Sequence, residues 1–289
     1  MVSGNGNGDS RASLAEFAKR YATAAGGALY AFTFGVGDAR NRRLIQEIAR
    51  RFGHQDGDVP RLPAIEIEAL TTPATPVVLP EPVANDGNVS LLELLVLARL
   101  VGELEPRRVF EIGTFDGRTT LTLAMNAPDD ARVYTLDLPA ESPTALSIER
   151  SERAFVDKRV SGARFIGTDA ARKITQLYGD SATFDFSPYR MDLIFVDASH
   201  AYEYVLNDSA RALAMLGDSP GVIVWHDYGE WPGVTRALDE LARSDSRFAS
   251  LRCVRGTSLA VLDRRHPDRN EGSRHQGSEV RDRGSGIPR

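Results

Sequence analysis

Short apolar runs alternate with amphipathic stretches over the second half of the chain. Leu193–Val196 and Val222–Trp225 contain no charged residue, which is typical of strands buried on both faces of a parallel sheet. Alternation of such strands with helices predicts a doubly wound α/β fold with a seven-stranded, mostly parallel sheet. The strands are expected at Arg108–Ile112, Arg132–Asp137, Ala163–Gly167, Met191–Asp197, Gly221–His226, Phe248–Val254 and Ser258–Leu262.

The first part of the chain has a different pattern. Ser3–Asp9 carries no apolar side chain, so we expect residues 1–9 to be disordered. A capping box at Ser13 and Glu16 predicts a helix, and Pro60–Pro82 is interpreted as an extended linker or small strands. We expect residues 10–86 to form an N-terminal accessory region, as a lid or a subunit contact. Its helices would present Leu14, Phe17, Ala18 and Tyr21, and then Leu44, Ile45, Ile48 and Phe52.

The main domain is predicted over residues 87–263. Ser90 and Glu93 form a second capping box, followed by apolar residues at helical spacing that would face the sheet. After Leu262 the chain is polar and charged, without a periodic apolar face. We therefore expect residues 264–289 to be a disordered tail.

Composition narrows the possible functions. A chain of 289 residues with 42% hydrophobic residues can bury a sizeable core, and its net charge of −5 argues against nucleic acid as a partner. The single Cys253 excludes an intramolecular disulfide, and no N-terminal signal pattern is seen, so a cytoplasmic location is expected. The apolar stretch Gly26–Val36 is shorter than the roughly 20 residues of a membrane span. No membrane partner is predicted.

Carboxylates follow five of the predicted strands. Ligands of open α/β sheets bind outside the carboxyl ends of the strands, so these acids are expected to converge on one site. A single strand-end Asp is more often a helix N-cap, but five together favour a binding function. The five acids are Glu111, Asp137, Asp169, Asp197 and Asp227.

The first predicted strand runs into a loop with two glycines. Gly113 and Gly117 carry no Cβ, so a ligand could approach their backbone, and the next helix would point free N–H groups at the same place. Such a turn also occurs as a tight connection in any parallel sheet. Asp137, at the end of the next strand, stands where the hydroxyls of a ribose would be held. Together these features predict a nucleoside cofactor.

These motifs resemble the class I S-adenosylmethionine-dependent methyltransferases, with a Rossmann-like sheet, over Ser90 to Asp263. The run from Glu111 to Gly117 is similar to their methionine-binding loop, Asp137 to the acid that binds ribose, and Asp169 with Ala170 to the turn that contacts adenine. The resemblance implies S-adenosylmethionine as cofactor. The implied binding residues are Glu111, Gly113, Thr114, Asp116, Gly117, Thr119, Asp137, Asp169, Ala170 and Asp197.

Two further segments, Asp197–Tyr202 and Trp225–Tyr228, resemble the divalent-metal-dependent O-methyltransferases of small molecules, especially those acting on sugars of natural products. The resemblance implies Asp197, His226 and Asp227 as metal ligands and His200 as the catalytic base. Oxygen-rich ligation fits Mg²⁺ best, whereas a histidine ligand leaves Mn²⁺ or Fe²⁺ open.

The chemistry of methyl transfer to a hydroxyl also favours a histidine. A neutral hydroxyl is a poor nucleophile, so a base must take its proton. Of the five histidines, only His200 and His226 follow a predicted strand beside a carboxylate. His200 comes three residues after Asp197, so in a helical turn the two would share a face. A histidine near its unperturbed pKa could accept the proton at neutral pH.

Nearby aromatic residues carry a weaker signal. Tyr202 and Tyr204 could line an acceptor pocket, although aromatic residues after a strand more often serve packing. Pro232 favours the start of a helix, so Trp231 could shape that turn or cover the acceptor.

Two other function classes remain open. A nicotinamide-dependent oxidoreductase would also use Asp137, but the loop from Gly113 to Gly117 lacks Gly-x-Gly-x-x-Gly spacing. A non-catalytic binding module of methyltransferase-like fold would be expected to lose Asp197 and Asp227. We expect an O-methyltransferase acting on a small-molecule hydroxyl, with homo-oligomerisation through the N-terminal region left open.

Overall fold

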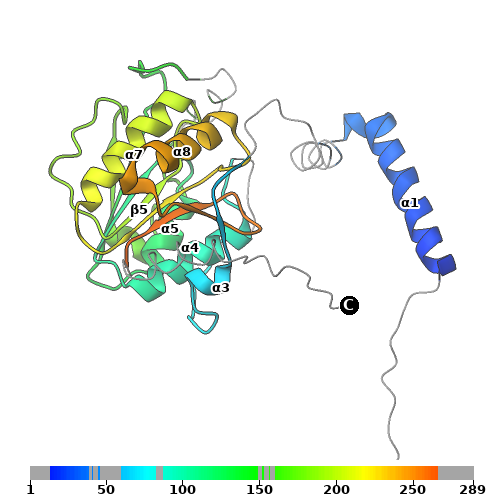
Figure 1. The fold of residues 1–289 in the computed structure, drawn as a ribbon, viewed down its shortest axis with the longest axis horizontal. Coiled ribbons are helices and arrows are strands. Elements are labelled where there is room, and N and C mark those ends of the chain that lie inside the picture. Colours follow the sequence, from blue (N-terminus) through cyan, green and yellow to red (C-terminus); the bar gives the residue numbers. More distant parts are fainter. Residues whose placement is uncertain are drawn as a thin grey trace, which may run out of the picture. The chain divides into compact units, whose positions relative to one another are not determined.

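The computed structural model describes residues 14–38, 41, 45, 60–82, 87–148, 152, 156 and 160–265. The chain divides into two compact units, Met1–Asp56 and Gly57–Arg289. The described part of the first unit consists mainly of helix α1 (Leu14–Phe32) and the 3₁₀ turn η1 (Phe34–Gly37) (Figure 1). No helix among the described residues has the length and apolar character needed to cross a bilayer.

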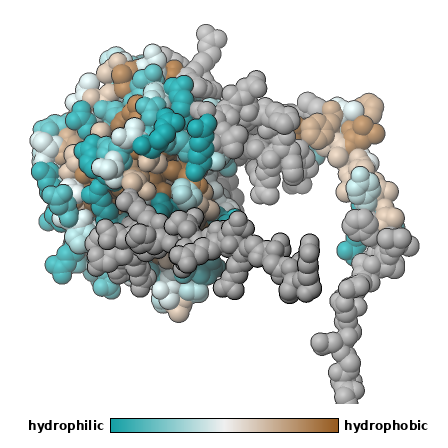
Figure 2. Space-filling view, in the orientation of Figure 1, coloured by the Kyte–Doolittle hydropathy of each residue, from teal (hydrophilic) through white to brown (hydrophobic). Residues whose placement is uncertain are grey.

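Helix α1 presents large apolar side chains at its surface. Figure 2 shows hydrophobic surface toward the end of the helix and in the turn that follows it. Ser13, Leu44, Ile48 and Phe52, on which two helix predictions partly depend, lie outside the described residues, whereas Ile45 is helical. The exposed large apolar side chains are Tyr21, Leu29, Tyr30 and Phe32 in α1 and Phe34 in η1.

The second unit is built on one eight-stranded sheet, with strand order β1-β7-β8-β6-β5-β2-β3-β4. All neighbouring strands are parallel except β8, which runs antiparallel to β6 and β7. The strands are β1 (Ala64–Ile65), β2 (Arg108–Ile112), β3 (Arg132–Asp137), β4 (Ile174–Tyr178), β5 (Leu193–Val196), β6 (Val222–Trp225), β7 (Arg252–Val254) and β8 (Ala260–Asp263).

Helices cover both faces of this sheet, as the doubly wound prediction requires. Helices α7 and α8 pack with Phe110 and Ile194 on one face, and α4 and α5 pack with Val109 and Phe195 on the other. Alternate residues of β2 therefore face opposite layers. The remaining helical elements are α3 (Ile67–Leu70), α4 (Leu91–Leu104), α5 (Arg118–Asn126), η3 (Asp169–Lys173), α7 (Tyr202–Leu216), α8 (Pro232–Ser244) and η4 (Ser246–Phe248).

The predicted strand at Ala163–Gly167 is wrong. Residues 161–167 form turns, and the strand next to β3 is β4, at Ile174–Tyr178. The backbone N–H groups of Gly162 and Arg164 donate to the carbonyls of Phe115 and Asp116. These hydrogen bonds join the segment to the loop after β2 and not to a neighbouring strand.

Residues 60–82 belong to the second unit and not to a separate accessory region. Strand β1 extends the sheet by pairing with β7, and the Tyr228 hydroxyl accepts hydrogen bonds from the backbone N–H groups of Arg61 and Leu62, both at 2.8 Å. At the other end, the Arg264 N–H donates to the Gly221 carbonyl. The predicted disorder of residues 1–9 falls outside the described residues, as does that of 266–289.

Candidate active site

The carboxyl ends of β2 and β5 meet at Gly113. This glycine has φ +102°, and a Cβ built on it would lie 1.8 Å from the carbonyl oxygen of Asp197. Only glycine lets the two strand ends approach so closely. A small pocket, open to solvent, lies at this edge. It is lined by Gly87, Asn88, Val89, Glu111, Gly113, Thr114, Phe115, Asp116, Arg118, Thr119 and Asp197.

Glu111 is the buried acid of this pocket. Its Oε2 accepts hydrogen bonds from the hydroxyls of Thr120 and Thr135, the latter at 2.7 Å. Burial raises the pKa of Glu111 to about 8 and outweighs both hydrogen bonds, which favour the charged form. The carboxyl group is therefore mostly protonated at neutral pH.

Asp116 holds the glycine loop in place. Its Oδ1 accepts from the Asn88 amide at 3.0 Å and from the Arg118 backbone N–H at 3.1 Å, and its Oδ2 accepts from Arg164 Nε at 2.7 Å. The buried guanidinium of Arg118 donates to the carbonyls of Glu81 and Val89. Residues on both sides of the pocket are thereby tied to the start of α5, where Gly117 is the N-cap.

Asp137 lies as predicted at the end of β3, beside β2, and its carboxylate accepts a hydrogen bond from the Ser161 hydroxyl. Asp169 and Ala170 do not share this edge. They precede β4, whose first residue pairs with Val133 at the start of β3. Their predicted position after a strand was therefore wrong, because the strand itself lies later in the sequence.

Asp180 follows β4 at the carboxyl edge instead. Its oxygens accept from the backbone N–H groups of Ala145 and Ala182 and from the Tyr204 hydroxyl. The sequence signal for it is Gly179-Asp180-Ser181 directly after Ile174–Tyr178. Sequence reasoning missed this site because β4 is a half-exposed edge strand with Thr and Gln among its residues.

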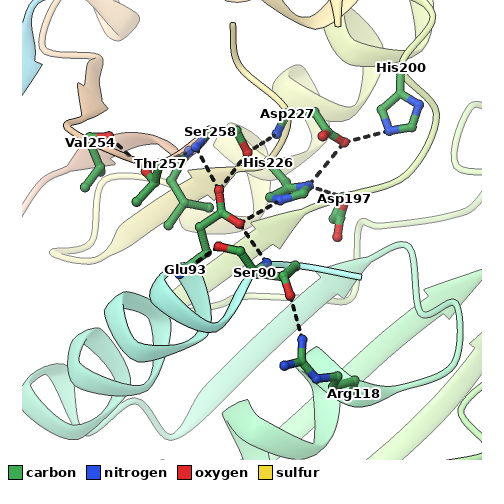
Figure 3. A network of polar contacts seen from close by, with 12 residues as sticks. Ser90, Glu93, Arg118, Asp197, His200, His226, Asp227, Val254, Thr257 and Ser258 are labelled. Carbon is green, nitrogen blue, oxygen red and sulfur yellow. Dashed lines mark hydrogen bonds and ion pairs between the residues drawn. The ribbon is translucent and has the colours of Figure 1, made fainter. Parts of the chain in front are cut away.

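Asp197, His226 and Asp227 form a cluster of potential metal ligands. One ligand atom of each lies within 4.8 Å of the others. His226 Nδ1 is 3.3 Å from Asp197 Oδ1 and 3.1 Å from Asp227 Oδ2 (Figure 3). Burial alone would lower the pKa of His226, but the two carboxylates outweigh it and raise that pKa well above its ordinary value.

Behind His226 lies Glu93, a buried acid that sequence reasoning treated only as a capping residue. The capping box of α4 is confirmed: the Ser90 hydroxyl accepts from the Glu93 N–H, and Glu93 Oε2 accepts from the Ser90 N–H at 2.8 Å. The same carboxylate also reaches His226 Nε2, at 3.3 Å, and accepts from the backbone and hydroxyl of Ser258. Despite burial, the hydrogen bond from His226 holds the pKa of Glu93 well below its usual range.

His200 is at the site, although not through a shared helical face. Residues 197–201 are not helical, and α7 begins only at Tyr202. His200 Nε2 lies 2.7 Å from Asp227 Oδ2, and Nδ1 lies 2.8 Å from Glu152 Oε1. Trp231 stacks on the imidazole with ring centroids 4.1 Å apart and planes at 11°. Trp231 therefore fixes the plane of the His200 ring.

The charge state of His200 differs from the sequence expectation. Burial would lower its pKa, but the hydrogen bonds to Asp227 and Glu152 outweigh burial and raise the pKa to about 10. With both carboxylates in place, His200 is an imidazolium at neutral pH and cannot accept a proton. The role of His200 as a base was argued from a pKa near the unperturbed value. That expected pKa is wrong for this arrangement.

Two tyrosines at the start of α7 are packing residues in this structure. The Tyr202 hydroxyl donates to Glu240 at 2.7 Å, and its ring lies under the Arg236 guanidinium. Tyr204 is buried and donates to Asp180. These contacts join α7 to α8 and to the end of β4.

Part of the chain is similar to known proteins. Residues 110–228 match a protein family described as a methyltransferase domain. A caffeoyl-CoA O-methyltransferase-like protein of Arabidopsis thaliana is 32% identical over 152 residues, covering 51% of this chain and 59% of the relative. The caffeoyl-CoA O-methyltransferase of Stellaria longipes is 28% identical, covering 55% of this chain and 61% of that protein. The matched segment thus spans little more than half the length of these curated relatives.

Among solved structures, an O-methyltransferase of Streptomyces achromogenes involved in tomaymycin synthesis, in complex with S-adenosylmethionine, matches part of this chain. Its TM-score is 0.44 at 22% identity, covering 62% of this chain and 82% of the other. An O-methyltransferase of Bacillus cereus in complex with S-adenosylhomocysteine has a TM-score of 0.43 at 17% identity, covering 62% and 84%. Residues 110–228 thus match a methyltransferase domain, and about half of this chain is similar in sequence to caffeoyl-CoA O-methyltransferases.

Proposed function

We propose that the protein is an S-adenosylmethionine-dependent, metal-assisted O-methyltransferase that acts on a hydroxyl of a small molecule, with a sugar of a secondary metabolite as one candidate. The observation that carries the proposal is the juxtaposition of two sites at one sheet edge. Asp197 lines the pocket at the glycine loop and is also a member of the ligand cluster with His226 and Asp227. A methyl donor and an acceptor held by these neighbouring sites would be in contact.

The residues present fit both groups. Glu111 and the backbone of the glycine loop suit the cationic methionine end of S-adenosylmethionine, which supplies a methyl group on a sulfonium. Asp197 and Asp227 offer oxygens, and His226 offers a nitrogen, to a divalent ion. Such an ion, when bound, orients the acceptor and lowers the pKa of its hydroxyl.

We assign His200 the role of proton acceptor. Asp227 Oδ2 is shared between His200 Nε2 and His226 Nδ1, so the protonation of His200 depends on where that oxygen is engaged. If Asp227 served as a metal ligand, its hold on His200 would weaken, and Nε2 would be available to take the hydroxyl proton. Trp231 keeps the ring oriented while the proton is transferred.

A methyl-transfer assay tests the proposal. Purified protein, S-adenosylmethionine and Mg²⁺ or Mn²⁺ would be incubated with a panel of phenols, catechols and sugars, and methylated products measured by mass spectrometry. His200→Ala should lower turnover about 10²–10⁴-fold with nearly unchanged S-adenosylmethionine affinity, and Asp197→Asn should abolish metal-stimulated turnover. Asp129→Asn, at an exposed carboxylate, is the matched control. Full turnover in excess chelator would contradict the metal role, and unchanged turnover in His200→Ala would remove it as the base.

The alternatives make different predictions in the same assay. A nicotinamide-dependent oxidoreductase would bind NAD, although the family match favours the methyltransferase. A binding module would take up S-adenosylhomocysteine without turning over any acceptor. Calorimetry with NAD and with S-adenosylhomocysteine, beside the turnover assay, distinguishes the three.

A further inference from the structure

We infer that Glu93 is a positioning residue for a histidine metal ligand: it holds His226 Nε2 so that Nδ1 faces the cluster formed with Asp197 and Asp227. The inference deepens the proposed function and rests on it for the presence of a divalent ion. It adds a second role to a capping residue on α4. It assigns a fixed orientation to the one nitrogen ligand of the mixed set formed by Asp197, His226 and Asp227.

The His226 ring lies between two groups of acids. Its two nitrogens face different groups, with Nδ1 toward Asp197 and Asp227 and Nε2 toward Glu93 (Figure 3). An imidazole that donates Nε2–H to a carboxylate has its lone pair on Nδ1. Metal-binding histidines in proteins commonly donate their other N–H to a carboxylate in this way. Glu93 therefore selects the tautomer that can bind a metal at Nδ1.

Hydrogen bonds hold the Glu93 side chain in one orientation. Its side chain is buried, and three donors fix it besides His226: the Ser90 N–H at 2.8 Å, the Ser258 N–H at 2.7 Å and the Ser258 hydroxyl at 2.8 Å. Two of these donors are backbone groups at the start of α4 and just before β8. A helix cap needs only the bond to Ser90. The additional bonds hold Oε1 at Ser258, which fixes the carboxylate with Oε2, the oxygen that also accepts from the Ser90 N–H, beside His226 Nε2.

The nitrogen of His226 affects which metal ion the cluster favours. Carboxylate and carbonyl oxygens suit Mg²⁺ and Ca²⁺, whereas imidazole suits the later divalent transition metals. A site that presents one imidazole nitrogen with two carboxylates favours ions such as Mn²⁺, Fe²⁺ or Co²⁺ over Mg²⁺. From the sequence, Mg²⁺ fitted best and Mn²⁺ or Fe²⁺ stayed open; the oriented imidazole favours the second group.

Mn²⁺ binding tests the inference directly. Mn²⁺ would be titrated into the full chain with S-adenosylhomocysteine present, with affinity measured by calorimetry and coordination by pulsed electron paramagnetic resonance. Wild type should show a ¹⁴N hyperfine coupling of a directly bound imidazole, and His226→Asp should lack it and lose preference for Mn²⁺ over Mg²⁺. Glu93→Gln should weaken Mn²⁺ binding about 10–100-fold.

Ser90→Ala is the matched control, because it removes the cap hydroxyl but keeps the Ser90 N–H that binds Glu93. It should lower stability without changing Mn²⁺ affinity beyond about twofold. If Glu93→Gln does not fold, as judged by circular dichroism, Glu93→Asp, which withdraws the carboxylate by one methylene, takes its place with the same expected loss.

The outcomes separate the inference from the proposed function. Bound Mn²⁺ without ¹⁴N coupling in wild type, or unchanged Mn²⁺ affinity in the folded Glu93 variant, would overturn the inference while a metal-dependent methyl transfer could still stand. Failure of wild type to bind either Mn²⁺ or Mg²⁺ would overturn both the inference and the metal part of the proposed function.

Discussion

Replacing Gly113 with alanine should disrupt the site through the backbone alone. A Cβ at this position would lie 1.8 Å from the carbonyl oxygen of Asp197 and 2.5 Å from its carbonyl carbon. Because these are backbone atoms, no side-chain rotation can relieve the overlap. The ends of β2 and β5 would have to separate, and Asp197 would move with its strand.

The magnitude can be worked out against a second glycine. Gly256 also has positive φ, +79°, but nothing lies within 4 Å of a Cβ built there. Gly256→Ala should cost only the left-handed backbone strain, about 1–2 kcal/mol. Gly113→Ala should add an overpacking cost of about 1–3 kcal/mol to a similar strain. The difference between the two variants thus isolates the overlap with Asp197.

Two measurements check this reasoning. Urea denaturation should show a larger loss of unfolding free energy for Gly113→Ala than for Gly256→Ala, and calorimetry should show weakened binding of both S-adenosylhomocysteine and Mn²⁺ only for Gly113→Ala. Equal destabilisation of the two variants, with ligand affinities retained in both, would refute the close approach of the strand ends.

Two pH effects follow from buried acids. Burial raises the pKa of Asp208 to about 6. Between about pH 4 and 6 the native state therefore binds more protons than the unfolded chain. The free energy of unfolding should fall by about 2–3 kcal/mol as pH rises through that window. Asp208→Asn should remove this slope in denaturation curves; an unchanged slope would contradict it. Since Glu111 is protonated at pH 7, binding of cationic S-adenosylmethionine should release a proton. Calorimetry in buffers of different ionisation enthalpy should detect the release in wild type but not in Glu111→Gln, and equal release in both would contradict it.

The central strands could be predicted from sequence because their residues are buried on both faces. Strands β2 and β3 have the predicted bounds, since short, mainly apolar runs are typical of strands buried on both faces. The edge of the sheet could not be predicted in this way. A strand was predicted at Ala163–Gly167, but Phe165 of this segment lies against Gly117 and Gly162 at the glycine loop. The edge strand β4 is half exposed and lacks an apolar run.

Site residues that lie at the end of a strand could be predicted from the sequence. Contacts between residues that are distant in the sequence could not. Asp197 and Asp227 each follow a strand, and the parallel order of β2, β5 and β6 brings them together. Glu93 contacts His226 across 133 residues of sequence, a pairing that no local pattern contains. His200 was placed by an assumed helical turn, whereas its ion pair with Asp227 depends on the loop after β6.

The charge balance at this edge explains why cations would be its ligands. Glu93, Asp197 and Asp227 are compensated among the described residues chiefly by His226 and His200, whose pKa values they raise. The protons on the two imidazoles thus supply positive charge that other cations could supply in their place. A divalent ion and a sulfonium would bring positive charge to the same carboxylates and favour release of protons from the imidazoles and from Glu111. Binding would thereby turn the acid-bound histidines into a metal ligand and a free base, which couples assembly of the site to the presence of both ligands.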